Sequence, residues 1–248
     1  MLESTTALAE LREKLAIGCH ILDQQGVVDS SGHLSVRVPG GNTYLIPARG
    51  AAGLATVESM LLMDENGAIL DGSGTAPIEW PIHGRLYSER KDVNCILHSH
   101  SPMSRVFSIS NAPLQPVFGI ASSWFHETIG ISGVLGAVSS PSAGNQLASD
   151  LGTASAILLR AHGSVVVGPG IEATTVRAIA LEQVAQSLYR ALSIGSVEHL
   201  SEAELRQWRS GAPGGDGKAW AYYRAQLGGR LVPSEPARTQ SPESVRTS

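Results

Sequence analysis

The stretch Cys95-Ile-Leu-His-Ser-His-Ser-Pro102, CILHSHSP, places two histidines two residues apart at the end of an apolar run. Residues 94–98 have the pattern of a buried β-strand. Successive side chains of a strand point to opposite faces, so His98 and His100 are expected on one face. Two imidazoles placed in this way can both reach one metal ion at about 2.0–2.1 Å. Taken alone, the pair is equally compatible with two polar residues that end a strand at the surface.

A third histidine makes a metal site the better interpretation. A catalytic site of the zinc type needs about three protein ligands and an open position. His162 is the strongest third candidate, because it too follows a buried strand and Gly163 lets the backbone turn closely there. His20 and His199 fit ordinary polar positions, and His83, inside a predicted helix, is left open with a structural role favoured. Histidines at two strand ends therefore predict a chemical site.

Glu79 is the candidate carboxylate of this site. It stands in APIEWPIHGRLYSER, at the expected start of a helix that runs to about Arg90. Ile78 and Trp80 flank it, so we expect partial burial, which raises a carboxyl pKa. Such a group can serve as an acid/base or as a displaceable metal ligand. Without the histidines, an ordinary glutamate that is stabilised by the helix dipole would be the simpler interpretation.

The bulk composition excludes several classes of function. The chain has 248 residues, 42% of them hydrophobic and 16% charged, which is typical of globular proteins. A net charge of −4 and an aromatic content of 5% argue against a nucleic-acid partner. No apolar run reaches the roughly 18 residues that a membrane span needs. Two cysteines, Cys19 and Cys95, imply no disulfide framework, so a cytoplasmic location is expected.

The pattern of the chain predicts one α/β domain over residues 1–231 and a disordered tail over 232–248, which is rich in proline, serine and charge. Residues 59–73 read as a hairpin with Glu65-Asn66-Gly67 at its tip, and residues 106–110 could be helical or extended. The other expected strands are 33–39, 43–48, 94–98, 156–161 and 164–168; the expected helices are 6–24, Pro77/Pro81 to Arg90, 145–152, 172–193, 201–210 and 217–227.

Several segments, in this order, resemble the class II aldolase/adducin family. The E…P-x-H…D-V…H-x-H-S-P block and the A-H-G-x-x-x-x-G block are both present, and the resemblance covers residues 8 to about 195. The matching segments are GVVDSSGHLSVRVP (26–39), LIPARG (45–50), IEWPIHGRLYSERKDVNCILHSHSP (78–102), AILLRAHGSVVVGPGIEAT (156–174) and LEQVAQ (181–186).

The resemblance implies a three-layer α/β/α fold with a mainly antiparallel central sheet. It implies one divalent metal ion per subunit, held by His98, His100 and His162, with Glu79 as the catalytic acid/base. Imidazole-rich sites accept Zn, Mn, Fe or Co, so the ion is left open. The resemblance also implies a homotetramer with active sites at subunit interfaces.

The chain departs from the sugar-phosphate aldolases of this family in three motifs. Those enzymes carry G-N-x-S, T-P-S-G and S-S-E, whose small polar groups cradle a phosphate. Here the corresponding segments are GHLS (32–35), IPARG (46–50) and PIE (77–79). The replacements His33 and Arg49 suit a carboxylate better, because arginine can hold it through two parallel hydrogen bonds. This pattern resembles the branch of the family that decarboxylates hydroxylated aromatic dicarboxylates.

On that resemblance, each remaining candidate has a role and an ordinary alternative. Glu79, His33 or His126 would protonate the ring carbon. Arg49 would orient a carboxylate, unless it forms a surface salt bridge. The remaining substrate-binding candidates are Ser35, Trp80, Phe125, Tyr222 and Tyr223. The aromatic members of this set would form a flat wall or close the pocket, and their alternative is plain core or helix packing.

The expected function is that of a metal-dependent lyase on a small-molecule carboxylate. The favoured reaction is non-oxidative decarboxylation of an ortho-hydroxylated aromatic (di)carboxylate through a metal-stabilised enolate or phenolate, which belongs to aromatic compound metabolism. Three alternatives stay open: an aldolase or epimerase acting on a hydroxy-carbonyl compound, a non-haem iron oxygenase acting on a hydroxyphenyl acid, and a metal-free scaffold protein.

Overall fold

A computed structural model describes residues 2–117, 119, 121, 124–125, 128–211 and 215–228. Its centre is an eight-stranded sheet with the strand order β4-β3-β2-β1-β5-β8-β7-β6. Every neighbouring pair is antiparallel except β6 and β7, so the predicted mainly antiparallel sheet is confirmed. The strands are β1 His33–Arg37, β2 Thr43–Pro47, β3 Met60–Asp64, β4 Ile69–Asp71, β5 Cys95–Ser99, β6 Gly130–Ser132, β7 Ala156–Leu159 and β8 Gly163–Gly168.

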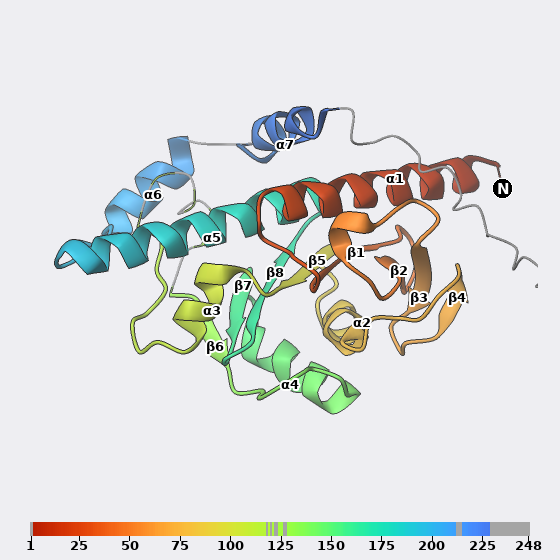
Figure 1. Cartoon of the computed structure of the whole chain (residues 1–248), viewed down its shortest axis with the longest axis horizontal. Coiled ribbons are helices and arrows are strands. Elements are labelled where there is room, and N and C mark those ends of the chain that lie inside the picture. Colours follow the sequence, from red (N-terminus) through yellow and green to blue (C-terminus); the bar gives the residue numbers. More distant parts are fainter. Residues whose placement is uncertain are drawn as a thin grey trace, which may run out of the picture.

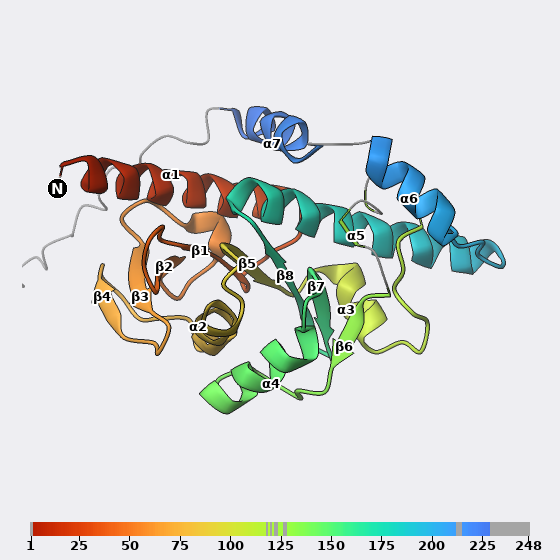
Figure 2. The same cartoon turned by 180° about the vertical axis from the view of Figure 1, so that it is seen from behind.

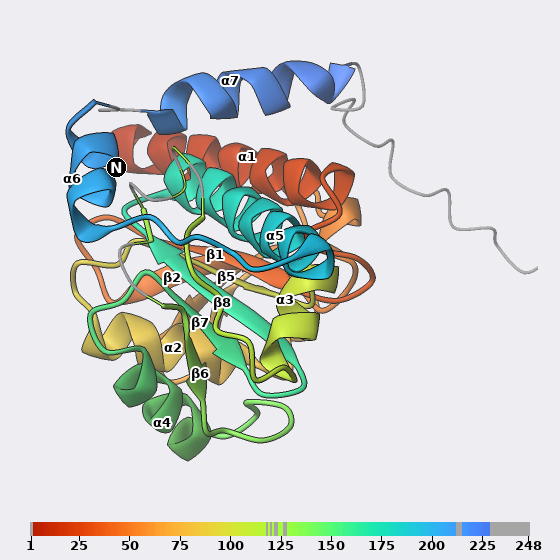
Figure 3. The same cartoon turned by 90° about the vertical axis from the view of Figure 1, so that its left-hand side faces the viewer.

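Helices cover both faces of this sheet and give the expected three-layer α/β/α arrangement (Figures 1 and 3). Helices α1 (Leu2–Gln24), α5 (Ile171–Ile194) and α7 (Gly215–Gln226) lie on one side, and α2 (Trp80–Glu89) and α4 (Pro141–Leu151) on the other. Figure 2 shows the same layers from behind, with α7 stacked outside α1 and α5. The remaining helices are α3 (Pro102–Ser108), α6 (Glu202–Gly211) and the short 3-10 turn η1 (Ala52–Leu54).

The alternation of side chains along β5 separates two hydrophobic cores. Cys95 and Leu97 belong to the core beneath α1 and α5, whereas Ile96 belongs to the core beneath α2 and α4. His98 follows Ile96 at a spacing of two, so its side chain points to the α2 face. The functional side of β5 is therefore the side that α2 covers.

The structure differs from the sequence-based elements at several places. The undecided segment 106–110 contains the end of α3, and α4 begins earlier than expected because Ser140 caps it and Pro141 occupies its first turn. Strand β6 was not anticipated, since three residues that include a glycine carry almost no alternation signal. Among the described residues, no helix has the length and apolar character that crossing a membrane requires.

Candidate metal centre and its cavity

His98 is held rigidly at the end of β5. Strand β1 pairs with β5 so that His33 lies directly opposite His98, and both side chains point to the α2 face. The His98 side chain is fully buried, and its Nδ1–H donates to the Ser164 carbonyl of β8 at 3.1 Å. With Nδ1 engaged by Ser164, Nε2 is the ring nitrogen that faces the other candidate ligands, which is the arrangement that metal-binding histidines commonly show.

His100 and His162 approach His98 from two different loops. His100 comes directly after β5, and His162 lies in the tight turn between β7 and β8. Ala161 in that turn has φ 55°, a left-handed conformation that side chains seldom adopt. A Cβ at Gly163 would clash with the Ser99 carbonyl, so glycine is required where β8 leaves this turn. The backbone of the turn thus directs His162 toward β5.

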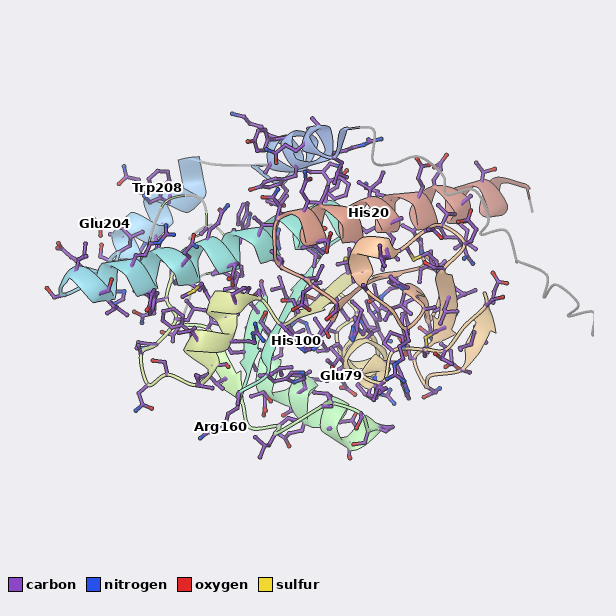
Figure 4. The ribbon with its side chains drawn as sticks, in the orientation of Figure 1. His20, Glu79, His100, Arg160, Glu204 and Trp208 are labelled. Carbon is purple, nitrogen blue, oxygen red and sulfur yellow. The ribbon has the colours of Figure 1, made fainter. Side chains whose placement is uncertain are left out.

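The three histidines and Glu79 form a compact group, with candidate ligand atoms all within 4.8 Å of one another. The Nε2 atoms of His98 and His100 are 3.0 Å apart. The Glu79 Oε2 atom lies 3.2 Å from the His98 Nε2 and 3.6 Å from the His162 Nε2. Ligands at about 2.0–2.1 Å around a tetrahedral ion would be roughly 3.4 Å apart, so the donor set fits one divalent cation. Figure 4 shows Glu79 and His100 together beside α2, with Arg160 well away from them.

The imidazoles of the two loops are suited to binding a cation. Burial, followed by the neighbouring His98 and His162, lowers the pKa of His100 to about 4. Burial and His98 also lower the pKa of His162, with Glu79 partly opposing them. A neutral imidazole has the free lone pair that a metal ion needs. The buried His162 Nδ1 has no hydrogen-bond partner within the described part of the chain.

Glu79 occupies the N-cap position of α2, but it does not cap the helix. Its Oε1 instead accepts a hydrogen bond from the Val138 N–H at 2.8 Å, which fixes the carboxylate beside the histidines. Partial burial raises its pKa as expected, yet the hydrogen bond and charge of His98, the Val138 N–H and His162 outweigh burial. The net pKa falls to about 2. The expected upward shift is therefore wrong, because partners that favour the charged form surround the group.

The metal-binding group opens into a cavity of about 340 Å³ whose lining includes Glu79, His100, His33 and Arg49. Arg49 is exposed and forms no ion pair with any residue that the structure describes. The ordinary alternative for Arg49, a surface salt bridge, is thus not observed. The other lining residues are Ser30, Ser31, Gly32, Pro47, Ala48, Gly50, Pro77 and Ile78. The Arg49 guanidinium, the Glu79 carboxylate and the imidazoles of His33 and His100 therefore line one small cavity.

Three of the predicted substrate-binding residues do not line this cavity in the single chain. Ser35 is fully buried and hydrogen-bonds to residues of α2. Trp80 packs against Gly67 at the tip of the β3–β4 hairpin and against the core beneath α2. Phe125 is 3% exposed and lies in the opposite core, where it lines a second cavity. For both aromatic residues, the observed position is the core packing that was the ordinary alternative.

The remaining candidates are separate from the cavity. Tyr222 and Tyr223 contact each other edge to face on α7, beyond α1 and α5, and Tyr222 is 60% exposed. Neither lines the cavity of its own chain, so their proposed closing role would require a neighbouring subunit. His126 lies outside the described residues.

The sequence did not assign His83 and Tyr87 to the site, although both contact it. They lie four residues apart on one face of α2, and their side chains meet His33 and Ser35 of β1. The sequence did carry a pattern for each pair. His83 and Tyr87, at i and i+4, share a helix face, and His33 and Ser35, at i and i+2, share a strand face. Only the packing of α2 on β1 joins the two faces.

The comparisons with known proteins agree with this geometry. The family model described as "Class II Aldolase and Adducin N-terminal domain" matches residues 13–189. A 3,4-dihydroxyphthalate decarboxylase from Arthrobacter keyseri is 28% identical over 219 residues, covering 80% of this chain and 86% of that protein. An L-fuculose phosphate aldolase from Methanococcus maripaludis is 30% identical over 174 residues, covering 69% and 92%.

The fold of the chain also agrees with that of a solved relative. The structure of an L-fuculose 1-phosphate aldolase from Glaciozyma antarctica superposes with a TM-score of 0.77 at 23% identity, covering 88% of each chain. With a family model that spans residues 13–189 and a sheet and helix arrangement shared with a solved aldolase, the chain belongs to the class II aldolase and adducin family.

Proposed function

We propose that this chain is a divalent-metal-dependent carboxy-lyase that removes CO₂ from an ortho-hydroxylated aromatic carboxylate. The observation that carries the proposal is the shared cavity, because Arg49, which forms no ion pair with any described residue, lines it together with Glu79 and His100 of the metal-binding group. A small aromatic acid would place its carboxylate on Arg49 and its hydroxyl oxygen beside His98, His100 and His162. A divalent ion bound there would supply Lewis acidity that stabilises negative charge on a substrate oxygen.

Glu79 is the acid/base of the proposed reaction. Its carboxylate accepts the proton of the substrate hydroxyl and delivers it to the ring carbon that bears the carboxylate. The bond between that carbon and CO₂ then breaks, and its electron pair restores the aromatic ring. The phenolate oxygen that remains takes up a proton from water, so the reaction consumes one proton for each CO₂ released. The Val138 N–H holds Glu79 in place for both transfers.

Two features support carboxylate chemistry over phosphate chemistry. Arg49 and His33 stand where the family's aldolases carry small polar groups for a phosphate, and both line the cavity. A 3,4-dihydroxyphthalate decarboxylase is also similar over 80% of this chain. The aldolase alternative is supported by the 30% identical L-fuculose phosphate aldolase, so the experiment has to distinguish the two products.

The test is product analysis on the purified, metal-loaded protein. Hydroxyphthalates, hydroxybenzoates and hydroxypyridine dicarboxylates labelled with ¹³C at the carboxylates are incubated, and released ¹³CO₂ is measured with and without EDTA. L-fuculose 1-phosphate is tested in parallel for aldehyde release. We expect CO₂ from at least one hydroxylated acid, and loss of that activity with EDTA. Aldehyde release without CO₂ would make the chain an aldolase instead.

The finer assignments rest on the same proposal. Zn, Mn, Fe and Co are all compatible with an imidazole-rich centre, and reloading the EDTA-treated protein with each ion identifies the active one. The homotetramer, the cytoplasmic location and the tail after residue 231 stay predictions from the sequence.

A further inference from the structure

Four polar side chains form a hydrogen-bonded chain that starts at the cavity wall and ends in the core. The His33 Nδ1 lies 2.6 Å from the His83 Nε2, and the His83 Nδ1 lies 2.6 Å from the Ser35 Oγ. The Ser35 Oγ in turn lies 2.8 Å from the Tyr87 hydroxyl. His83 and Ser35 are fully buried and Tyr87 is 1% exposed, so the part of the chain behind His33 lies out of contact with solvent.

Each of these three hydrogen bonds contains a single hydrogen atom. The donor in one bond therefore determines the donor in the next. Burial lowers the pKa of His83 to about 3, so its ring is neutral and carries a single N–H. His83 therefore donates at one nitrogen and accepts at the other. Ser35, with one hydroxyl hydrogen, likewise donates to one neighbour and accepts from the other. The three hydrogen bonds must consequently all run in the same direction.

The Tyr87 end decides which direction that is. Within the described part of the chain, the Tyr87 hydroxyl has Ser35 as its one hydrogen-bond partner. If Ser35 donated to Tyr87, the Tyr87 hydrogen would be buried without an acceptor, at a cost of about 1–3 kcal/mol. If Tyr87 donates to Ser35, Ser35 donates to the His83 Nδ1 and His83 donates from Nε2 to the His33 Nδ1. The hydrogens of Tyr87, Ser35 and His83 then each have an acceptor.

This direction defines the chemical state of His33. Its Nδ1 is an acceptor, so the ring hydrogen lies on Nε2, the nitrogen that is left for the cavity. A neutral imidazole in that state donates a hydrogen bond and can stabilise charge on a substrate oxygen. It has no lone pair to offer there, so it cannot act as a base on a substrate.

We propose that His83, Ser35 and Tyr87 are positioning residues that hold His33 as the neutral Nε2–H tautomer, which donates a hydrogen bond to an anionic oxygen of the ligand in the cavity. The inference rests on the proposed function for the ligand class, an aromatic carboxylate. The tautomer of His33 itself follows from the hydrogen bonds among His33, His83, Ser35 and Tyr87. Ser35, expected from the sequence to bind substrate, acts through His83 instead.

The first test reads the tautomer directly and needs no substrate. Protein labelled with ¹⁵N-histidine and loaded with Zn²⁺ is examined by long-range ¹H–¹⁵N NMR at neutral pH, and the His33 signals are assigned by their loss in His33→Gln. We expect a protonated Nε2 and an unprotonated Nδ1 for His33, and the same state for His83. A His33 ring with hydrogen on Nδ1 overturns the proposal, whether or not any CO₂-releasing activity is found.

The second test asks whether a donor at position 83 is what matters. His83→Gln keeps an N–H that can reach His33, whereas His83→Met has a similar size and no donor. The probe is phthalate, an aromatic dicarboxylate without the hydroxyl that the reaction needs, and its binding to the Zn²⁺-loaded variants is measured by calorimetry. We expect His83→Gln to bind within about threefold of the wild type and His83→Met about tenfold or more weakly. Zinc content and the midpoint of thermal unfolding serve as controls for folding.

Equal phthalate affinities of the Gln and Met variants would overturn the positioning role, since the donor would then be irrelevant. Tyr87→Phe provides a matched check of the direction. It removes the hydrogen at the far end but leaves Ser35 free to donate to His83, so His33 should keep its Nε2–H signal. A switch of that signal to Nδ1 in Tyr87→Phe would contradict the proposed direction.

Discussion

At the scale of single residues, Arg49 is the group expected to select a carboxylate. It is exposed, it lines the cavity and no described acidic side chain neutralises it. Hydrogen bonds to charged groups contribute about 1.5–3 kcal/mol, so Arg49→Ala should raise KM for the substrate roughly 10- to 100-fold. Arg49→Lys should recover only part of this, because an ammonium lacks the planar fork. Steady-state kinetics check both variants against Arg190→Ala, an exposed arginine on α5. An unchanged KM in Arg49→Ala would show that this arginine does not hold the substrate.

The Glu79 carboxylate should also be visible in the acid stability of the metal-free protein. The pKa of Glu79 is lowered from 4.5 to about 2, so its stabilising effect is fully present above pH 4.5 and is lost as the pH falls toward 2. The size of the effect is on the order of 3 kcal/mol. Urea unfolding at several pH values should therefore show a gap between wild type and Glu79→Gln that closes between pH 4.5 and 2. A gap that stays constant across this range would mean that Glu79 titrates normally in the folded chain.

At the scale of elements, Glu182 of α5 fixes the segment that follows His100. Its carboxylate accepts hydrogen bonds from the Met103 N–H at 2.7 Å and the Ser104 N–H at 3.1 Å, at the first turn of α3. Negative charge at a helix N-terminus is stabilising, and loss of a comparable cap costs about 1 kcal/mol. Glu182→Ala should lower the free energy of unfolding by roughly that amount and weaken metal binding through His100. The neighbouring exposed Gln183→Ala is the matched control, and equal metal affinity in both variants would separate Glu182 from the metal centre.

The elements also show why the sequence predicts some of the site and not the rest. His98 lies near the end of β5, and His100 and His162 come after the ends of strands, so spacing and strand patterns were enough to indicate a shared site. The group behind His33 depends on how α2 packs against β1, and such a contact leaves no sign in either segment alone. Trp80 illustrates the opposite case, because its place beside Glu79 in sequence suggested a cavity wall. The first turn of α2 instead directs it toward Gly67.

At the scale of the whole molecule, the order of motifs predicted the three-layer fold correctly, since the family resemblance carries the topology that local patterns lack. The cavity of a single chain is not lined by any residue of α7. The tyrosine pair Tyr222 and Tyr223 lies on α7, on the opposite side of the sheet from α2 and Glu79. A closing role for these tyrosines is therefore possible only in an assembly, and the expected tetramer would have a mass of about 104 kDa, four copies of 26.0 kDa.

Mixed assemblies can test this arrangement. Glu79→Gln chains should be inactive, and chains with both tyrosines changed to alanine should have a raised KM, whereas Tyr189→Ala, which alters an exposed tyrosine of α5, should not. If a site combines Glu79 of one chain with the tyrosines of its neighbour, co-assembling the two defective chains recreates intact sites. The CO₂ release of the mixture should then exceed the sum of the separate preparations, with light scattering confirming the tetramer. If the CO₂ release of the mixture only equals the sum of the separate preparations, the tyrosines lie outside the active site. In that case no neighbouring subunit supplies the group that a defective chain lacks.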